Sequence, residues 1–252
     1  MLFYSALLLK MRCINQQNSR KFEAKDNKMK FNPNVLKTIF CALILFFYVS
    51  SNAQSLPYWQ EVQAFKKMDS ISMPSQYKTL FIGSSSFTLW KTLEQDLPEY
   101  APLNRGFGGS TLLDVIRYRK DIIDKYNPER IVIYCGENDV ASSDTVTAKV
   151  VFDRFKVLYQ HLRGKFPKID IYFVSLKPSP SRWSMRERMV DANAYIERFC
   201  KKEKHTYFIS IWKQMLENSK PIPSIFKEDS LHMNAKGYEI WIKAIRKEIK
   251  PS

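Results

Sequence analysis

Two almost continuously apolar runs constrain the fold more than any other feature of this sequence. Residues 130–135 read Arg-Ile-Val-Ile-Tyr-Cys, and residues 169–175 read Ile-Asp-Ile-Tyr-Phe-Val-Ser. Short runs without polar alternation are typical of strands that are covered on both faces. Residues 78–82, 102–104 and 206–209 form shorter runs of the same kind, so we expect five strands in all.

Stretches with helical periodicity separate these runs. Apolar residues recur every three or four positions in three stripes: Val151, Phe155, Leu158 and Leu162; Met185, Met189, Ala192 and Ile196; and Tyr238, Trp241, Ile242, Ile245 and Ile249. Asn234 is placed to cap the last of these helices. Strands that alternate with helices predict the α/β class, here a three-layer α/β/α sandwich around a five-stranded parallel sheet. Ligands of such folds bind beyond the carboxyl ends of the strands.

Residues 1–53 differ from the rest of the chain. Lysines precede an apolar run, residues 38–49, which is shorter than the about 20 residues that span a bilayer. Ser51-Asn52-Ala53 follows, and this combination is typical of a secretory signal peptide cleaved after Ala53. We therefore expect an exported protein, periplasmic or extracellular, with one domain over residues 54–252; an uncleaved N-terminal anchor is the alternative.

The sequence leaves open whether Met1 or Met29 is the true start. Met29 opens Met-Lys-Phe-Asn-Pro-Asn directly ahead of the apolar run. This position is the natural beginning of a signal peptide. It therefore favours Met29 as the initiator and residues 1–28 as an extension that is not translated.

Charge and cysteine content exclude several classes of protein. Eight of the 40 Lys and Arg and two of the 25 Asp and Glu lie in residues 1–53, so the remainder carries a net charge of +9. That excess suits anionic surfaces or acidic polysaccharides, and an ordinary well-solvated basic surface is the alternative. No basic-aromatic nucleic-acid motif accompanies it. Cys135 and Cys200 are too few for a disulfide framework and lack metal-ligand spacing. We expect no cofactor, no metal, no nucleic acid and no stable membrane insertion after cleavage; the oligomeric state stays open.

Four short polar segments are typical of one active site when they are taken together. They are residues 81–87 with a serine triplet, the glycine-rich residues 104–110, residues 135–139 (Cys-Gly-Glu-Asn-Asp) and residues 229–232 (Asp-Ser-Leu-His). The first three follow the first three expected strands, so they should meet at one edge of the sheet. No single segment is specific, whereas their order and placement are.

Ser85 is the expected nucleophile, because it stands at a strand-to-helix turn. A serine hydroxyl needs a base, and the base needs a group that orients it. His232, in the loop before the last helix, is the expected base, and Asp229 is its expected partner. An ordinary turn or cap would use the same residue types, and spacing alone does not choose Ser85 over Ser84 or Ser86.

An oxyanion also needs fixed donors. The backbone N–H groups of Ser85 and Gly109 and the side-chain amide of Asn138 are the candidates. Glycine lets the chain approach a ligand closely. A flexible connection at the glycines and a polar strand exit at Asn138 are the alternatives.

Over roughly residues 77–245 these segments resemble the SGNH or GDSL hydrolase superfamily. The residues that correspond to its conserved blocks are Ser85, Gly109, Asn138, and the pair Asp229 and His232. The resemblance selects Ser85 within the triplet. It implies a flavodoxin-like SGNH hydrolase fold and ester hydrolysis through an acyl-serine intermediate without a metal.

One block departs from the family pattern. Its Gly-Asp-Ser-Leu reads Gly-Ser-Ser-Ser at residues 83–86, a form that, with Trp90 nearby, is similar to the branch related to platelet-activating-factor acetylhydrolase. The absent Asp is not one of the four named residues, so the departure does not imply lost activity. Residues 177–183 (Lys-Pro-Ser-Pro-Ser-Arg-Trp) also resemble that branch. We expect Trp90, Arg182 and Trp183 to line a substrate pocket; a surface loop is the alternative at residues 177–183.

These observations favour an exported serine esterase that acts on short-acyl, chiefly acetyl, esters of small molecules or carbohydrates. A lysophospholipase, a thioesterase or an O-acyltransferase could use the same residues. A non-catalytic carbohydrate-binding protein is a further alternative, which the complete residue set disfavours.

Overall fold

The computed structural model describes residues 34, 37, 56–75 and 77–250. The backbone divides into two units, residues 1–54 and 55–252. The signal peptide that the sequence predicts, its cleavage site and Met29 lie outside the described residues. Within the described part, no helix has both the length and the apolar character that crossing a membrane requires.

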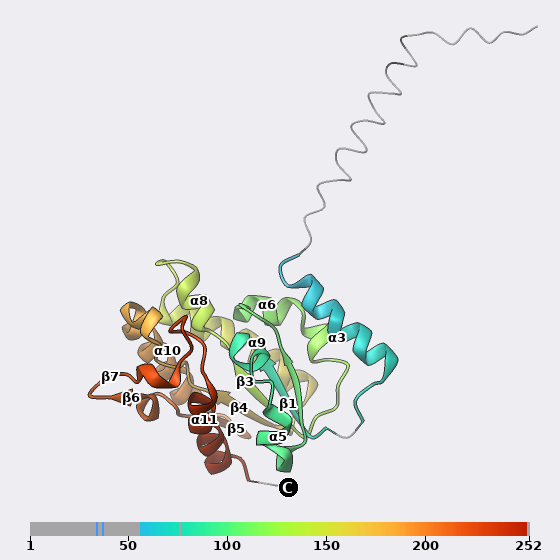
Figure 1. Ribbon diagram of the computed structural model, residues 1–252. Helices are drawn as coiled ribbons and strands as arrows, with labels where there is room; N and C mark the ends of the chain where they lie inside the picture. The colour runs from blue at the N-terminus through green and yellow to red at the C-terminus, as the bar shows by residue number, and fades with distance from the viewer. Residues whose placement is uncertain (1–33, 35–36, 38–55, 76, 251–252) are drawn as a thin grey trace, which may run out of the picture. The chain divides into compact units, whose positions relative to one another are not determined.

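A five-stranded parallel sheet forms the centre of the second unit (Figure 1), as the apolar runs predict. The strands are β1 (Thr79–Gly83), β2 (Pro102–Gly106), β3 (Arg130–Tyr134), β4 (Asp170–Val174) and β5 (Thr206–Ile209). They lie in the order β2-β1-β3-β4-β5, and every neighbouring pair is parallel. All residues of β1 and β3 are buried, which explains why their sequences lack polar alternation.

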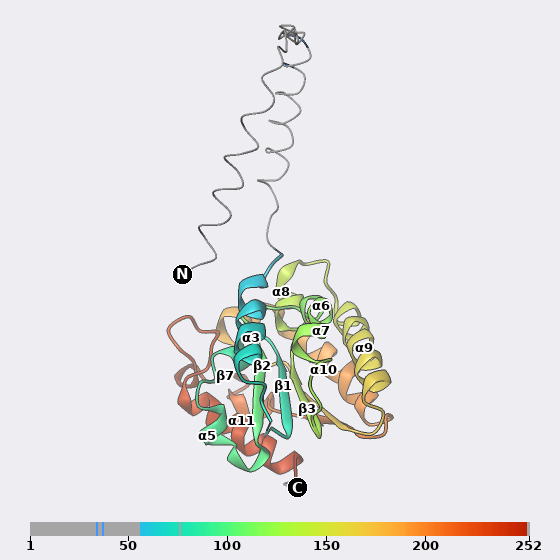
Figure 2. The same cartoon turned by 90° about the vertical axis from the view of Figure 1, so that its right-hand side faces the viewer.

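Helices cover both faces of this sheet (Figures 1 and 2), which confirms the expected three-layer sandwich. The α-helices are α3 (Trp59–Ile71), α4 (Ser85–Thr88), α5 (Leu93–Asp96), α6 (Leu112–Arg117), α7 (Arg119–Ile122), α8 (Glu137–Ser142), α9 (Ala148–Lys165), α10 (Arg186–Cys200) and α11 (Ala235–Glu248). Shorter elements are the 3-10 turns η2 (Pro98–Tyr100), η3 (Pro180–Met185), η4 (Lys213–Met215) and η5 (Pro223–Ile225), and the hairpin of β6 (Leu216–Glu217) and β7 (Lys220–Pro221).

Two hydrophobic cores lie on opposite faces of the sheet. Leu80 and Ile82 of β1 belong to the core that α6, α9 and α10 complete. Phe81, between them, belongs to the core that α4 and α11 complete. Successive strand residues point to opposite faces, so a strand buried on both sides needs apolar residues at every position.

The observed strand ends differ from the expected ones by one or two residues. β1 includes Gly83 and β2 continues to Gly106, because Gly83 pairs with both Gly106 and Tyr134. Gly83 has φ of +138°, and a Cβ there would lie 1.9 Å from the carbonyl oxygen of Tyr134. Glycine is therefore required at the point where the chain leaves the sheet toward the serine triplet.

The expected helical stripes are buried except at two positions. Met185 and Ile242 are only partly buried. Met185 belongs to the 3-10 turn η3, and α10 begins one residue later, so the first position of that stripe packs against the core only at its margin. Helix α11 begins as expected, with the Asn234 side chain accepting from the N–H of Gly237 at 3.4 Å.

Helix α11 is also tied to the serine segment. The hydroxyl of Tyr238 donates to the carbonyl oxygen of Ser86 at 2.9 Å, across 152 positions of sequence. His232 stands two residues before the cap at Asn234. The packing of α11 against α4 therefore brings the histidine loop to the serine turn.

Candidate active site

Ser85 is the first residue of α4, directly beyond β1, and it is the one exposed member of its triplet. Ser84 and Ser86 are 3% and 2% exposed, whereas Ser85 is partly exposed. Below it, the ring of Phe87 is fully buried and packs edge-on against Phe81. Burial therefore supports the choice of Ser85, which spacing alone could not make.

His232 and Asp229 lie beside Ser85 in one continuous chain of contacts. Nε2 of His232 is 3.0 Å from Oγ of Ser85, and Nδ1 is 2.6 Å from Oδ2 of Asp229. The other carboxylate oxygen, Oδ1, accepts the backbone N–H groups of Leu231 at 2.9 Å and His232 at 2.8 Å. Positive φ at Ser230, +54°, lets the chain turn back this sharply.

These contacts also control the charge of Asp229. Partial burial alone would raise the pKa of its carboxyl group. The hydrogen bonds from the backbone and ring of His232 and from Leu231 outweigh that effect and lower the pKa to about 2. Asp229 is therefore ionised at neutral pH and can hold a proton on the Nδ1 side of the imidazole ring.

The two other histidines have carboxylate partners of their own. His161 is partly buried on α9, with Nε2 2.6 Å from Oδ1 of Asp124. His205 lies in a turn, with Nδ1 3.0 Å from Oδ1 of Asp170. Neither contacts Ser85, so His232 is the histidine that the fold delivers to the serine.

The expected oxyanion donors lie on a loop and on a neighbouring helix. Gly109 follows β2 and has φ of +67°, and Asn138 is the second residue of α8, after β3. Nδ2 of Asn138 donates to the carbonyl oxygen of Ser110 at 3.0 Å, which ties the glycine loop to α8. The structure thus brings the Gly109 loop and the start of α8 together at the same edge of the sheet as Ser85.

Helix α3 holds the glycine loop from outside, a contact that the sequence did not reveal. The hydroxyl of Tyr58 donates to the carbonyl oxygen of Gly109 at 2.9 Å, and a carboxylate oxygen of Glu61 accepts the N–H of Gly108 at 2.9 Å. Such pairings, about 50 residues apart in sequence, leave no periodic signal. They fix the backbone of the loop that carries Gly109.

Asp139, next to Asn138, is fully buried and has a structural role. Its carboxylate accepts the N–H of Leu112 at 2.8 Å and pairs with Arg154 at 2.7 Å. Burial raises the pKa of this carboxyl, and Arg154 and Leu112 only partly offset that effect. Asp139 therefore joins α8 to α6 and α9, which fixes the helix that carries Asn138.

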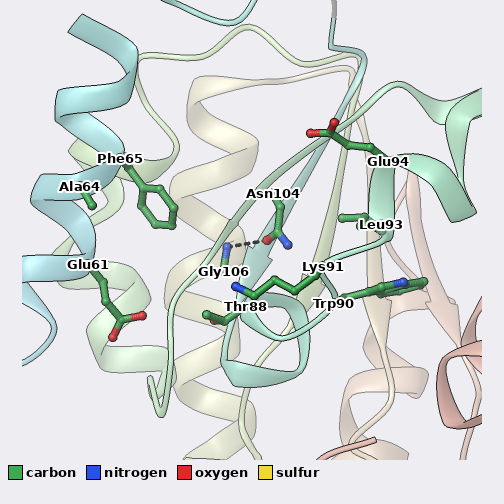
Figure 3. A pocket seen from close by; sticks show the side chains of 10 residues that line it. All are labelled: Glu61, Ala64, Phe65, Thr88, Trp90, Lys91, Leu93, Glu94, Asn104 and Gly106. Carbon is green, nitrogen blue, oxygen red and sulfur yellow. Dashed lines mark hydrogen bonds between the residues drawn. The ribbon is translucent and has the colours of Figure 1, made fainter. Parts of the chain in front are cut away.

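The three expected pocket residues occupy different surroundings. Trp90 is 1% exposed, stacks on Tyr238 and donates from Nε1 to Asp96 at 2.7 Å, so it offers almost no surface to a substrate. Its burial reflects the aromatic core between α4 and α11. It borders a cavity of about 380 Å³ between α3 and the α4–α5 segment (Figure 3), which no expected catalytic residue lines.

Arg182 and Trp183 lie on η3, at the carboxyl edge of the sheet. Arg182 donates to Oδ1 of Asn138 at 2.9 Å, so it contacts a candidate oxyanion donor directly. Trp183 stacks on Trp212 with ring centroids 6.2 Å apart, beside a cavity of about 430 Å³. Among the described residues, no group of three or more His, Cys, Asp and Glu side chains could hold a metal ion.

A Ser–His–Asp chain at the carboxyl edge of a doubly covered parallel sheet is typical of serine hydrolases. The sequence also matches the model of the GDSL-like Lipase/Acylhydrolase family over residues 77–240. The chain belongs to this family and is a carboxylic ester hydrolase. None of the curated proteins compared with the sequence matches it.

Solved structures share the fold. A protein provisionally named a platelet activating factor, from Streptococcus pneumonia, superposes with a TM-score of 0.66 at 15% identity, over 86% of this chain and 99% of that one. A GDSL-like lipase from Bacteroides thetaiotaomicron gives 0.63 at 22% identity, over 74% and 95%. A mutant acetyl-xylooligosaccharide esterase from Geobacillus Stearmophilus gives 0.53 at 16% identity, over 69% and 94%.

The lowered pKa of Asp229 predicts a pH dependence of stability. A carboxyl whose folded pKa of about 2 lies below its ordinary value of 3.8 stabilises the fold above 3.8, and the contribution is lost as pH falls toward 2. We compare the free energies of unfolding of the wild type and Asp229→Asn in urea. Their difference should be constant near neutral pH and shrink below about pH 4. A difference that stays unchanged down to pH 2.5 would contradict this account.

Proposed function

We propose that this protein is a serine esterase that removes short acyl groups, chiefly acetyl, from small-molecule or carbohydrate esters. The observation that carries the proposal is the unbroken chain from Oγ of Ser85 through His232 to Asp229, with contacts of 3.0 and 2.6 Å. Hydrogen-bond contact from nucleophile to base and from base to a buried or ionised partner is the geometry that activates a serine.

In the first half of the proposed reaction, Ser85 attacks the ester carbonyl. Nε2 of His232 takes the proton from Oγ as the new C–O bond forms, and Asp229 stabilises the resulting imidazolium. The negative charge on the carbonyl oxygen receives hydrogen bonds from the N–H groups of Ser85 and Gly109 and from Nδ2 of Asn138. Collapse breaks the ester C–O bond, and His232 gives its proton to the departing alcohol.

In the second half, water replaces the alcohol. His232 takes a proton from the water as it attacks the acyl-serine, and a second tetrahedral intermediate forms at the same donors. Its collapse releases the carboxylic acid and returns the proton to Oγ of Ser85. Each proton passes through one imidazole ring, so no metal is needed to activate water.

Two observations support an acetylated carbohydrate as the substrate. Solved structures with this fold include an acetyl-xylooligosaccharide esterase and an acetyl esterase holding an acetate ion. In this chain, Trp183 and Trp212 form a partly exposed aromatic surface on the same sheet edge as Asn138. An aromatic ring presents an apolar face and suits the C–H face of a sugar ring.

Longer acyl chains define the second candidate function. The family description includes lipases, so lysophospholipase or thioesterase activity would use the same residues. An O-acyltransferase would also form the acyl-serine but would pass the acyl group to a hydroxyl other than water. A non-catalytic binding role does not require an exposed serine in contact with a paired histidine.

Rates of p-nitrophenol release from acetyl, butyryl and octanoyl esters test the main proposal. We expect activity to fall with chain length and to vanish in Ser85→Ala, because Ser85 supplies the only oxygen nucleophile placed at Nε2 of His232 among the described residues. Ser86→Ala is the matched control and should stay active, since Ser86 is buried. Highest activity on octanoyl esters would favour the second candidate function, which acts on longer acyl chains. Full activity in Ser85→Ala would refute the proposed mechanism.

We also propose that the protein is exported after cleavage at Ala53. The basic, apolar and small-residue order of residues 28–53 supports this. When the full-length chain is expressed in cells that process signal peptides, the intact mass of the recovered protein should correspond to a chain that begins at Gln54. A chain that retains Met1, or that retains residues 29–53, would contradict cleavage.

A further inference from the structure

The side-chain amide of Asn138 is held at both of its ends. Nδ2 donates to the carbonyl oxygen of Ser110 at 3.0 Å, and Oδ1 accepts from a guanidinium nitrogen of Arg182 at 2.9 Å. A carbonyl cannot donate and a guanidinium cannot accept, so each contact permits one orientation of the amide. Both contacts select the same one, and the second N–H of Nδ2 is left for an oxyanion.

This orientation matters because an asparagine amide has nearly the same shape when it is flipped. The flipped amide would present a carbonyl oxygen to the developing negative charge and repel it. A donor lost from an oxyanion hole costs about 100- to 1000-fold in turnover. Whatever keeps Asn138 in the productive orientation therefore contributes to catalysis without contacting the substrate.

Arg182 spans two partners. One guanidinium nitrogen contacts Asn138, and another lies 3.3 Å from Oε1 of Glu137. The Arg182 side chain is 17% exposed and stands at a kink in η3, where its own backbone leaves helical geometry (φ −116°, ψ 17°). A planar guanidinium can make both contacts at once, which a lysine ammonium on a flexible stem cannot reproduce.

Glu137 is in turn held by a buried polar cluster. It is 3% exposed and immediately precedes Asn138 in α8. Its Oε2 accepts from Nζ of Lys177 at 2.5 Å and from the Tyr134 hydroxyl at 2.5 Å, and its Oε1 accepts from Ser179 at 3.3 Å. Arg182 is the fourth partner of this carboxylate, and the four contacts together hold the Glu137 side chain in one position.

Two cationic side chains, Lys177 and Arg182, contact the single carboxylate of Glu137. Burial alone would raise the pKa of Glu137, but Lys177 and Arg182 outweigh burial and lower it, so the carboxylate is anionic. Buried ion pairs often add nothing to stability compared with apolar residues of the same size. The Glu137–Lys177 pair is joined to Asn138 through Arg182, so a geometric role explains it better than a contribution to stability does.

We propose that Arg182 is a positioning residue that fixes the Asn138 amide for oxyanion binding, and that Glu137, clamped by Lys177, anchors Arg182. This inference rests on the proposed esterase function. If Arg182 acts through Asn138, replacing Arg182 should no longer lower kcat once the Asn138 amide has been removed. An Arg182 that bound the substrate directly would keep its effect.

A double-mutant cycle on p-nitrophenyl acetate makes this distinction. We expect Arg182→Met to lower kcat about 10-fold and to leave KM within about twofold, because a charge-assisted contact is lost at a group that acts in the transition state. In an Asn138→Ala background, the same change should alter kcat by less than about twofold. Equal losses in both backgrounds, or an unchanged kcat in Arg182→Met, would overturn the proposal.

Two further variants distinguish a positioning role of Arg182 from an effect of its positive charge and from a general effect of losing an arginine on folding. Arg182→Lys keeps the charge but not the two-way contact, so its kcat should stay within about threefold of Arg182→Met; full recovery would show that charge alone suffices. Arg188→Met is the matched control. Arg188 is 25% exposed and binds the carbonyl oxygens of Val140 and Ser143 beyond Asn138, and its loss should leave kcat within about twofold.

A readout independent of turnover completes the test. The side-chain amide resonances of Asn138, assigned by their loss in Asn138→Ala, should shift in Arg182→Met and not in Arg188→Met. Unchanged resonances in Arg182→Met would overturn the positioning role. This holds even if the wild-type protein cleaved none of the esters, an outcome that would count against the esterase proposal alone.

Discussion

The packing of α4 against α11 is the interaction on which the candidate site depends. Ser85 and His232 are 147 positions apart, yet their side chains approach to 3.0 Å. Aromatic residues hold the two helices together: Trp90 stacks on Tyr238 at 4.8 Å, and Phe87 meets Trp241 edge-on at 6.0 Å. Large buried aromatic groups bring both apolar area and defined geometry, so they fix helix positions well. A serine nucleophile requires that precision, because its base must lie within hydrogen-bond reach.

The proposed oxyanion donors are anchored by parts of the chain that lie outside the strand-and-helix core. Tyr58 and Glu61, near the start of α3, hold the loop that contains Gly109. Arg182, on η3, holds Asn138. The family model begins at residue 77, so the α3 contacts come from a segment before the matched region. The candidate site thus draws its supports both from the region that matches the family model and from the α3 segment before it.

Much of the fold could be read from the sequence because buried parallel strands are apolar at every position. Ile131 and Val132 face opposite cores, and both positions had to be apolar. Ser85, Gly109 and Asn138 could be predicted because they follow strand ends, where parallel strands deliver them to one edge. Asp229 and His232 could be predicted from their spacing of three residues ahead of the last helix. Spacing left Ser84, Ser85 and Ser86 equivalent; the structure separates them by burial.

The supports of the site could not be predicted in the same way. Glu137 and Lys177 are charged, and sequence patterns assign charged residues to the surface, yet both are nearly fully buried. Their pairing joins residues 40 positions apart, and no local periodicity records such a contact. The surroundings of Trp90 were hidden for a related reason: a tryptophan near a catalytic serine suggests a pocket, and the sequence does not indicate that this side chain is packed in the core between two helices while it borders a cavity.

The central claim is that Ser85 is a nucleophile activated by His232. Labelling with a fluorophosphonate, followed by peptide mapping in a mass spectrometer, tests it most directly. We expect one adduct, on Ser85, with a labelling rate that falls sharply in His232→Ala. An adduct on Ser84 or Ser86, or an equal rate in His232→Ala, would contradict it.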